Sequence, residues 1–61
     1  MKTRKLSDGT LQIGYKNAQG WVGIMNIYRS KGGWISDCFV GWEKTITEWK
    51  NRAKIYLEVG P

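Results

Sequence analysis

The chain has 61 residues, with ten Lys and Arg against five Asp and Glu and no His, so its formal net charge is +5. This length fits one small domain near the lower limit for folding without disulfides or a bound metal. The single cysteine, Cys38, excludes an internal disulfide. No apolar stretch follows the basic N-terminus or approaches the length of a membrane span, so we expect a cytoplasmic protein with no membrane partner.

Residues 1–6 are predicted to form a basic N-terminal arm, and the sequence leaves open whether they add a fourth strand. Ser7-Asp8-Gly9 is typical of a turn, because Asp can close its own backbone turn and Gly tolerates positive φ. The first strand is expected over residues 10–16, where apolar and polar side chains alternate.

Two further strands are predicted over residues 21–29 and 34–42, joined by a hairpin loop at residues 30–33. Register decides which side chains share a face. Pairing Arg29 with Trp34 places Asn26 opposite Asp37, and the neighbouring register would bury Asp37 without a partner, which is expensive. The first register is therefore expected, and the three strands form an antiparallel meander.

In this register the two faces of the sheet differ in their expected surroundings. The predicted core face holds Leu11, Ile13, Tyr15, Trp21, Met25, Ile27, Cys38, Val40 and Trp42. The predicted outer face holds Lys16, Val22, Ile24, Asn26, Tyr28, Ile35, Asp37 and Phe39.

A C-terminal helix is expected to begin near Thr45, because Thr45-Ile46-Thr47-Glu48 fits a capping box. Its apolar stripe, at helical spacing, comprises Ile46, Trp49, Ala53, Tyr56 and Leu57, and Gly60-Pro61 should end it. Gly23 is expected to leave room for Trp49 against the sheet. The predicted fold is thus α+β: residues 7–61 form one β-β-β-α domain whose helix packs on one face of the sheet.

Catalytic chemistry finds little support in this composition. The chain lacks His, the commonest general base and metal ligand, and has neither a metalloprotease motif nor a glycine-rich phosphate loop. Asp37 has no second carboxylate nearby in the predicted sheet, and Cys38 is expected to point inward. We therefore expect a protein that is not an enzyme and that uses no cofactor and no metal.

One amphipathic helix shields one face of a small sheet, so the other face is left for solvent or a partner. Aromatic rings beside cations suit nucleic acid, because bases stack on the rings while Lys and Arg contact phosphates. The leading hypothesis is nucleic-acid binding, single- or double-stranded, through the exposed sheet face and the basic arm. The residues expected to bind nucleic acid or another partner are Arg4, Lys5, Lys16, Ile24, Tyr28, Arg29, Lys31 and Phe39.

Aliphatic residues on the same predicted face suit a protein partner better than a base or a phosphate. The alternative is therefore a protein-binding module, such as an inhibitor or adaptor from a phage or other mobile element. Two further possibilities are a homodimer through the sheet face and an N-terminal arm that folds across it.

The order of three strands and a helix resembles the arm-binding domains of phage-type integrases and plant-type DNA-binding sheets. The stretch from Ile27-Tyr28 through Thr45-x-x-Glu48-Trp49 is similar to single-strand binders of the transcription-cofactor type. Gly33-Trp34-x-Ser36 before Thr45-x-x-Glu48 is similar to antitoxins with a partial RNase H fold. None of these stretches carries its family's diagnostic motif, so no family is assigned and no site residue is transferred.

Overall fold

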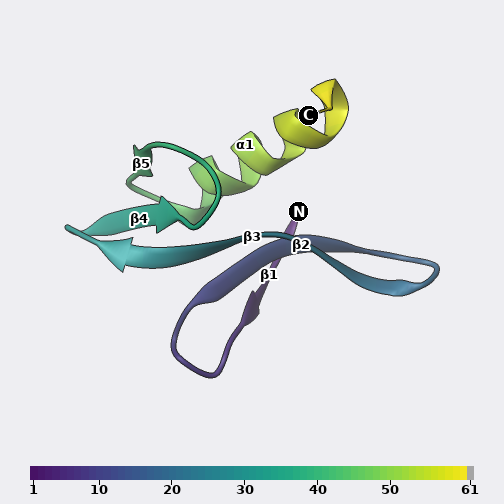
Figure 1. The fold of residues 1–61 in the computed structure, drawn as a ribbon, viewed down its shortest axis with the longest axis horizontal. Helices are drawn as coiled ribbons and strands as arrows, with labels where there is room; N and C mark the ends of the chain where they lie inside the picture. The colour runs from purple at the N-terminus through teal and green to yellow at the C-terminus, as the bar shows by residue number, and fades with distance from the viewer. Residues whose placement is uncertain (61) are drawn as a thin grey trace.

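The computed structural model describes residues 1–60, which contain a single antiparallel sheet and one C-terminal helix, α1 (Figure 1). The sheet has five strands in the order β1-β2-β3-β4-β5. The predicted α+β class is confirmed, but the sheet has five strands rather than three. The elements are β1 (Lys2–Lys5), β2 (Leu11–Asn17), β3 (Gly20–Ser30), β4 (Gly33–Ser36), β5 (Trp42–Glu43) and α1 (Ile46–Val59).

The basic N-terminal segment is an edge strand, because β1 pairs antiparallel with β2 over its whole length. The predicted turn before β2 is confirmed: Gly9 has a φ of 85°, and Asp8 Oδ1 accepts a hydrogen bond from the Thr10 amide at 3.0 Å. Lysine and arginine on an edge strand disfavour pairing with a second sheet. The sheet is therefore extended by the N-terminal segment, which does not fold across its face.

A β-bulge at Ile24 changes which residues of β3 face the helix. Ile13 pairs with Met25 and Gly14 pairs with Gly23, so Ile24 has no partner on β2. Side chains alternate between faces along a strand, and one inserted residue exchanges the faces beyond it. Trp21 therefore lies on the face opposite α1. The sequence pattern predicted it on the core face, which the helix covers.

Val22 moves in the opposite direction for the same reason. It pairs with Tyr15, which shares the face of Ile13, so Val22 lies on the side of α1 rather than on the predicted outer face. Ile24 itself is half-buried and packs against the core. Both residues were expected to be exposed opposite the helix, and the bulge makes that expectation wrong.

The hairpin between β3 and β4 has the predicted register, with Arg29 opposite Trp34. Strand β4 nevertheless ends at Ser36, whereas a continuous strand was predicted through residue 42. Ser36 Oγ accepts hydrogen bonds from the amides of Cys38 (3.2 Å) and Phe39 (3.3 Å), which turns the chain out of the sheet. Trp42 then returns to pair with Ile35 in the short strand β5.

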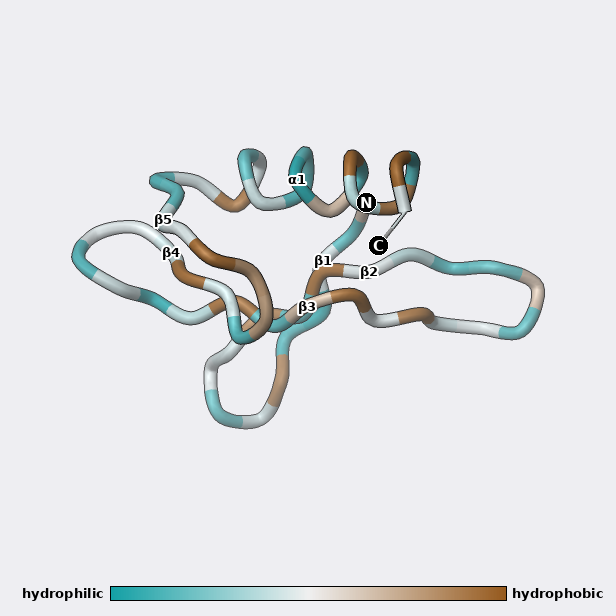
Figure 2. Tube along the Cα trace, turned by 45° about the horizontal axis from the view of Figure 1, so that its top comes forward, coloured by the Kyte–Doolittle hydropathy of each residue, from teal (hydrophilic) through white to brown (hydrophobic). Residues whose placement is uncertain are grey.

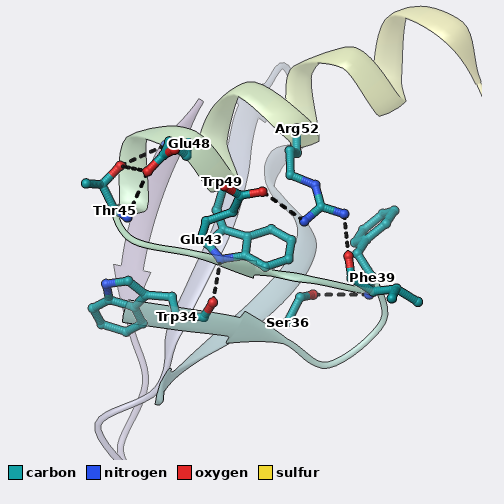
Figure 3. A network of polar contacts seen from close by, with 9 residues as sticks. Trp34, Ser36, Phe39, Glu43, Thr45, Glu48, Trp49 and Arg52 are labelled. Carbon is teal, nitrogen blue, oxygen red and sulfur yellow. Dashed lines mark hydrogen bonds and ion pairs between the residues drawn. The ribbon is translucent and has the colours of Figure 1, made fainter. Parts of the chain in front are cut away.

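This early end exposes three residues that the alternating pattern placed in the core. Cys38 is exposed, Val40 is 91% exposed and Trp42 is 46% exposed. Arg52 holds the loop of residues 37–41 against α1, because it donates to Val40 O at 2.5 Å and pairs with Glu43 at 3.3 Å (Figure 3). The loop therefore lies on the helix side of the sheet.

The hydrophobic core lies between the sheet and α1, which runs along one side of it (Figure 2). Trp49 is fully buried, and its indole Nε1 donates to the carbonyl of Trp34 at 3.0 Å (Figure 3). A buried indole N–H needs such a partner, so this bond orients Trp49 across the sheet. The buried core residues are Ile13, Met25, Ile27, Trp34, Trp49 and Ala53.

Helix α1 begins with the predicted capping box: Thr45 Oγ1 accepts from the Glu48 amide at 3.2 Å, and Glu48 Oε1 accepts from the Thr45 amide at 3.1 Å. It continues past Leu57 to Val59, and the Gly60 amide donates to Tyr56 O at 2.8 Å; Pro61 lies outside the described residues. Leu57, predicted on the buried stripe, is 44% exposed.

No helix within residues 1–60 is long and apolar enough to cross a membrane.

Candidate functional site

The face of the sheet opposite α1, which we call the outer face, carries no second layer of helix or strand in the described chain (Figure 2). Paired residues on neighbouring strands share a face, so the register assigns its side chains. The outer face comprises Lys2, Arg4, Gln12, Lys16, Trp21, Asn26, Tyr28, Ile35 and Trp42.

Three side chains at the β1 end of the outer face form a hydrogen-bonded cluster. Gln12 Oε1 accepts from Trp21 Nε1 at 2.7 Å and from Arg4 Nη2 at 3.1 Å. The Arg4 guanidinium also lies over the indole of Trp21, with its carbon 5.1 Å from the ring centroid. These contacts hold Arg4 in place, and its other N–H groups remain free of hydrogen bonds within residues 1–60.

Two glycines make room for this cluster. A Cβ on Gly14 would lie 2.8 Å from Trp21 Cζ2, and a Cβ on Gly23 would lie 2.6 Å from Gln12 Cδ. Neither distance is possible for a real side chain, so the cluster requires both glycines. The expectation that Gly23 leaves room for Trp49 is wrong, because the bulge turns Gly23 away from the helix.

A row of three exposed side chains, two of them aromatic, extends over β3, β4 and β5 at the other end of the outer face. Tyr28 pairs with Ile35, and Ile35 pairs with Trp42, so the three side chains form one row. They are 37%, 39% and 46% exposed, respectively. The Trp42 indole covers Gly33, where a Cβ would lie 2.5 Å from Cε2, and its Nε1 donates to Ser30 O at 2.7 Å.

Most acidic side chains accept hydrogen bonds from other groups of the protein, whereas most basic side chains have no carboxylate partner in the described part of the chain. The carboxylates that accept hydrogen bonds are Asp8, Asp37, Glu43 and Glu48. Arg52–Glu43 is the one ion pair within residues 1–60, so the other nine Lys and Arg have no carboxylate partner there. Of these nine, Lys2, Arg4 and Lys16 lie on the outer face.

Three of the sequence-predicted binding residues share the outer face, at separate places along it: Arg4, Lys16 and Tyr28. Ile24 and Phe39, predicted beside them, are half-buried and pack against the core. The Phe39 ring meets Tyr56 edge-on, with the centroids 5.1 Å apart. These two residues therefore belong to the helix side, which corrects their expected position.

The remaining predicted cations lie away from the outer face. Lys5 pairs with Leu11 and Arg29 with Trp34, both on the helix side by register. The guanidinium of Arg29 is stacked over the Trp34 ring at 5.2 Å. Lys31 lies in the β3–β4 turn with a φ of 52°. The structure thus separates these cations from Arg4 and Lys16.

The alternation of side chains in the sequence did not predict that Trp21 and Trp42 lie on the outer face, or that Gln12 binds Trp21. The signal that was present is glycine inside strands, at Gly14, Gly23 and Gly33. Such glycines mark bulges and close approaches. Two of them here lie under an indole ring.

The candidate site is an open surface, since the described part of the chain has no pocket and no group of three or more metal-ligating side chains. Cys38 lies exposed in the loop after β4, where partial desolvation and the neighbouring Asp37 raise the pKa of its thiol. Comparison with known protein families, curated proteins and solved structures found no match to this chain.

Proposed function

We propose that this protein binds nucleic acid through the outer face, with the basic strand β1 at its margin. The observation that carries the proposal is the combination of Trp21, Tyr28 and Trp42 with cations that have no internal carboxylate partner. Phosphates are the natural counter-charge for such cations, and binding releases the counterions condensed on the nucleic acid. Indole and phenol rings add contacts to bases that salt does not screen.

The bulge also removes the main argument for a protein partner on this face. That argument depended on aliphatic side chains at Val22 and Ile24, which lie on the helix side or against the core. Ile35 is the one aliphatic side chain that the outer face retains. Rings and cations therefore dominate it, and this composition favours nucleic acid.

A fluorescence-anisotropy titration with labelled 20-nucleotide DNA, single-stranded and duplex, tests the proposal across salt concentrations. We expect affinity to fall as salt rises, with a slope that reports the number of phosphate contacts. The double variant Arg4→Gln/Lys16→Gln should lower affinity and reduce the slope by about 1 for each cation.

The matched control is Lys50→Gln/Lys54→Gln, which removes the same charge from α1 and should lower affinity less. Thermal unfolding of both variants establishes that they are folded. Equal losses in the two variants would mean that only net charge matters and would contradict an interface on the outer face. Absence of binding at low salt would contradict the function itself.

A protein-binding module remains the second candidate, and a different surface favours it. On the last turns of α1, Ile55 and Val59 lie one turn apart on the same face and are 58% and 78% exposed. Exposed aliphatic side chains on consecutive turns are typical of protein contacts. A pull-down in which Ile55→Glu abolishes capture of a partner, while Tyr28→Ala does not, would support this candidate over the first.

A further inference from the structure

We infer that the outer face binds single strands in preference to duplexes, with unpaired bases stacking on Trp42 and Tyr28. This inference rests on the proposed nucleic-acid function and specifies its ligand. It depends on the surroundings of the two tryptophans of the outer face. A guanidinium covers the ring of Trp21, whereas no aromatic or cationic group within residues 1–60 covers the ring of Trp42.

The indole of Trp42 is fixed in place with one side open. Its inner side covers Gly33, and the Nε1–Ser30 hydrogen bond of 2.7 Å restrains rotation of the ring. Trp42 forms no aromatic or cation–π pair within residues 1–60, and it is 46% exposed. A ring that is already ordered loses little conformational entropy when a base stacks on it.

Trp21 is likewise held by a glycine under its ring and a hydrogen bond from its Nε1, but a guanidinium also lies over its ring. Its inner side covers Gly14, and its Nε1 is bonded to Gln12 at 2.7 Å. The guanidinium of Arg4 occupies its ring face, at 5.1 Å from the centroid. Trp21 therefore positions Arg4 for a phosphate, whereas Trp42 leaves its ring for a base.

The positions of the rings favour unpaired bases. Tyr28 and Trp42 are separated by two strand intervals, or about 10 Å between their Cα atoms. Ile35 lies between them in the row, so each ring can take its own base. Rings that lie along a sheet cannot reach the faces of bases stacked inside a duplex, whose exposed parts are groove edges. In a single strand those faces are free.

The same anisotropy assay, with a 20-mer of thymidine and a 20-base-pair duplex, tests the inference. Wild type should bind the single strand more tightly than the duplex. Trp42→Ala should weaken single-strand binding by about 5-fold to 150-fold, which corresponds to one lost stacked base. Its duplex affinity should change less than 3-fold, and Trp42→Phe, which keeps a ring, should retain most single-strand affinity.

Two controls separate stacking from disturbance of the sheet. Ile35→Ala removes a neighbour in the same row that has no ring, and it should weaken single-strand binding less than Trp42→Ala does. Tyr28→Leu keeps an apolar group without an aromatic face, so it should weaken single-strand binding, and it decides the matter where Trp42→Ala does not fold.

Three outcomes bear on the inference. Selective loss of single-strand binding in the ring-deleting variants supports it. Equal losses on single strand and duplex, or a wild-type preference for duplex, would overturn the stacking assignment and leave nucleic-acid binding intact. Failure of wild type to bind either oligonucleotide would overturn the proposed function as well.

Discussion

Replacing Gly33 with alanine tests whether the indole of Trp42 is packed against the backbone of β4. The new Cβ would lie 2.5 Å from Trp42 Cε2 and 2.6 Å from the carbonyl oxygen of Glu43. Ordinary carbon contacts are about 3.5–4.0 Å, so the ring and the β5 backbone must shift by about 1 Å. The Nε1–Ser30 hydrogen bond of 2.7 Å would then be broken.

The loss in the free energy of unfolding follows from three contributions. Overpacking costs about 1–3 kcal/mol, and the lost hydrogen bond about 1 kcal/mol. Alanine recovers about 0.5–1 kcal/mol because the unfolded chain is less flexible than with glycine. The net loss is about 2 kcal/mol, which lowers Tm by about 8–16 °C in a domain of this size.

Thermal unfolding followed by circular dichroism measures this loss, with Gly23→Ala as the matched glycine control. The Cβ at Gly23 meets only the end of the Gln12 side chain, which can rotate away if it gives up its hydrogen bonds to Trp21 and Arg4. No backbone or ring atom has to move, so the Tm of Gly23→Ala should fall less. In a Trp42→Ala background the loss caused by Gly33→Ala should decrease by about half, since only the contact with Glu43 remains. A Gly33→Ala protein that unfolds at the wild-type temperature would refute the packing of the indole on β4.

Three further outcomes follow from contacts at the ends of elements. Thr45→Ala removes the acceptor for the Glu48 amide and should lower the free energy of unfolding in urea by about 1 kcal/mol, whereas Thr47→Ala should leave it unchanged. Hydrogen bonds from the Thr10 side chain and amide hold the pKa of the Asp8 carboxyl below its ordinary value. The stability from Asp8 is therefore complete above the unfolded pKa of about 3.9 and is lost as pH falls through the folded value. Asp8→Asn should thus show a shallower loss of stability from pH 5 to pH 2; an unchanged curve would contradict this. Because partial desolvation and Asp37 raise the pKa of the Cys38 thiol, iodoacetamide should alkylate the native thiol at pH 7.4 more slowly than the urea-unfolded thiol, and equal rates would contradict this prediction.

Local chemistry in the sequence predicted the features that depend on a few adjacent residues. The turn at Asp8-Gly9, the capping box of Thr45 and Glu48, and the pairing of Arg29 with Trp34 are all observed. Each depends on side chains that bond to a nearby backbone or on the length of a hairpin loop. Such interactions are independent of the rest of the fold.

The side-chain faces were harder to predict because they depend on continuous alternation. One unpaired residue, Ile24, moves Trp21 to the outer face, and the turn at Ser36 ends β4 before Cys38. Neither interruption disturbs the apolar pattern of the sequence, which is rich in apolar residues at odd and even positions alike. Arg4 and Lys16 share the outer face as predicted, whereas Lys5, which was predicted with them, lies on the helix side. The contacts of Arg4 with Gln12 and Trp21 could not be predicted.

The unpaired residue in β3 has a consequence for comparing this chain with any relatives found later. A chain with the same residues in a regular strand, without the bulge, would present Val22 where this one presents the indole of Trp21. A chain that lacks only Ile24 would keep every other pair and would still present the indole, so a one-residue gap there preserves the exposed surface and identical letters do not guarantee it. Similarity scores averaged along the strand would overlook a change of face, so structural alignment should precede any transfer of binding residues.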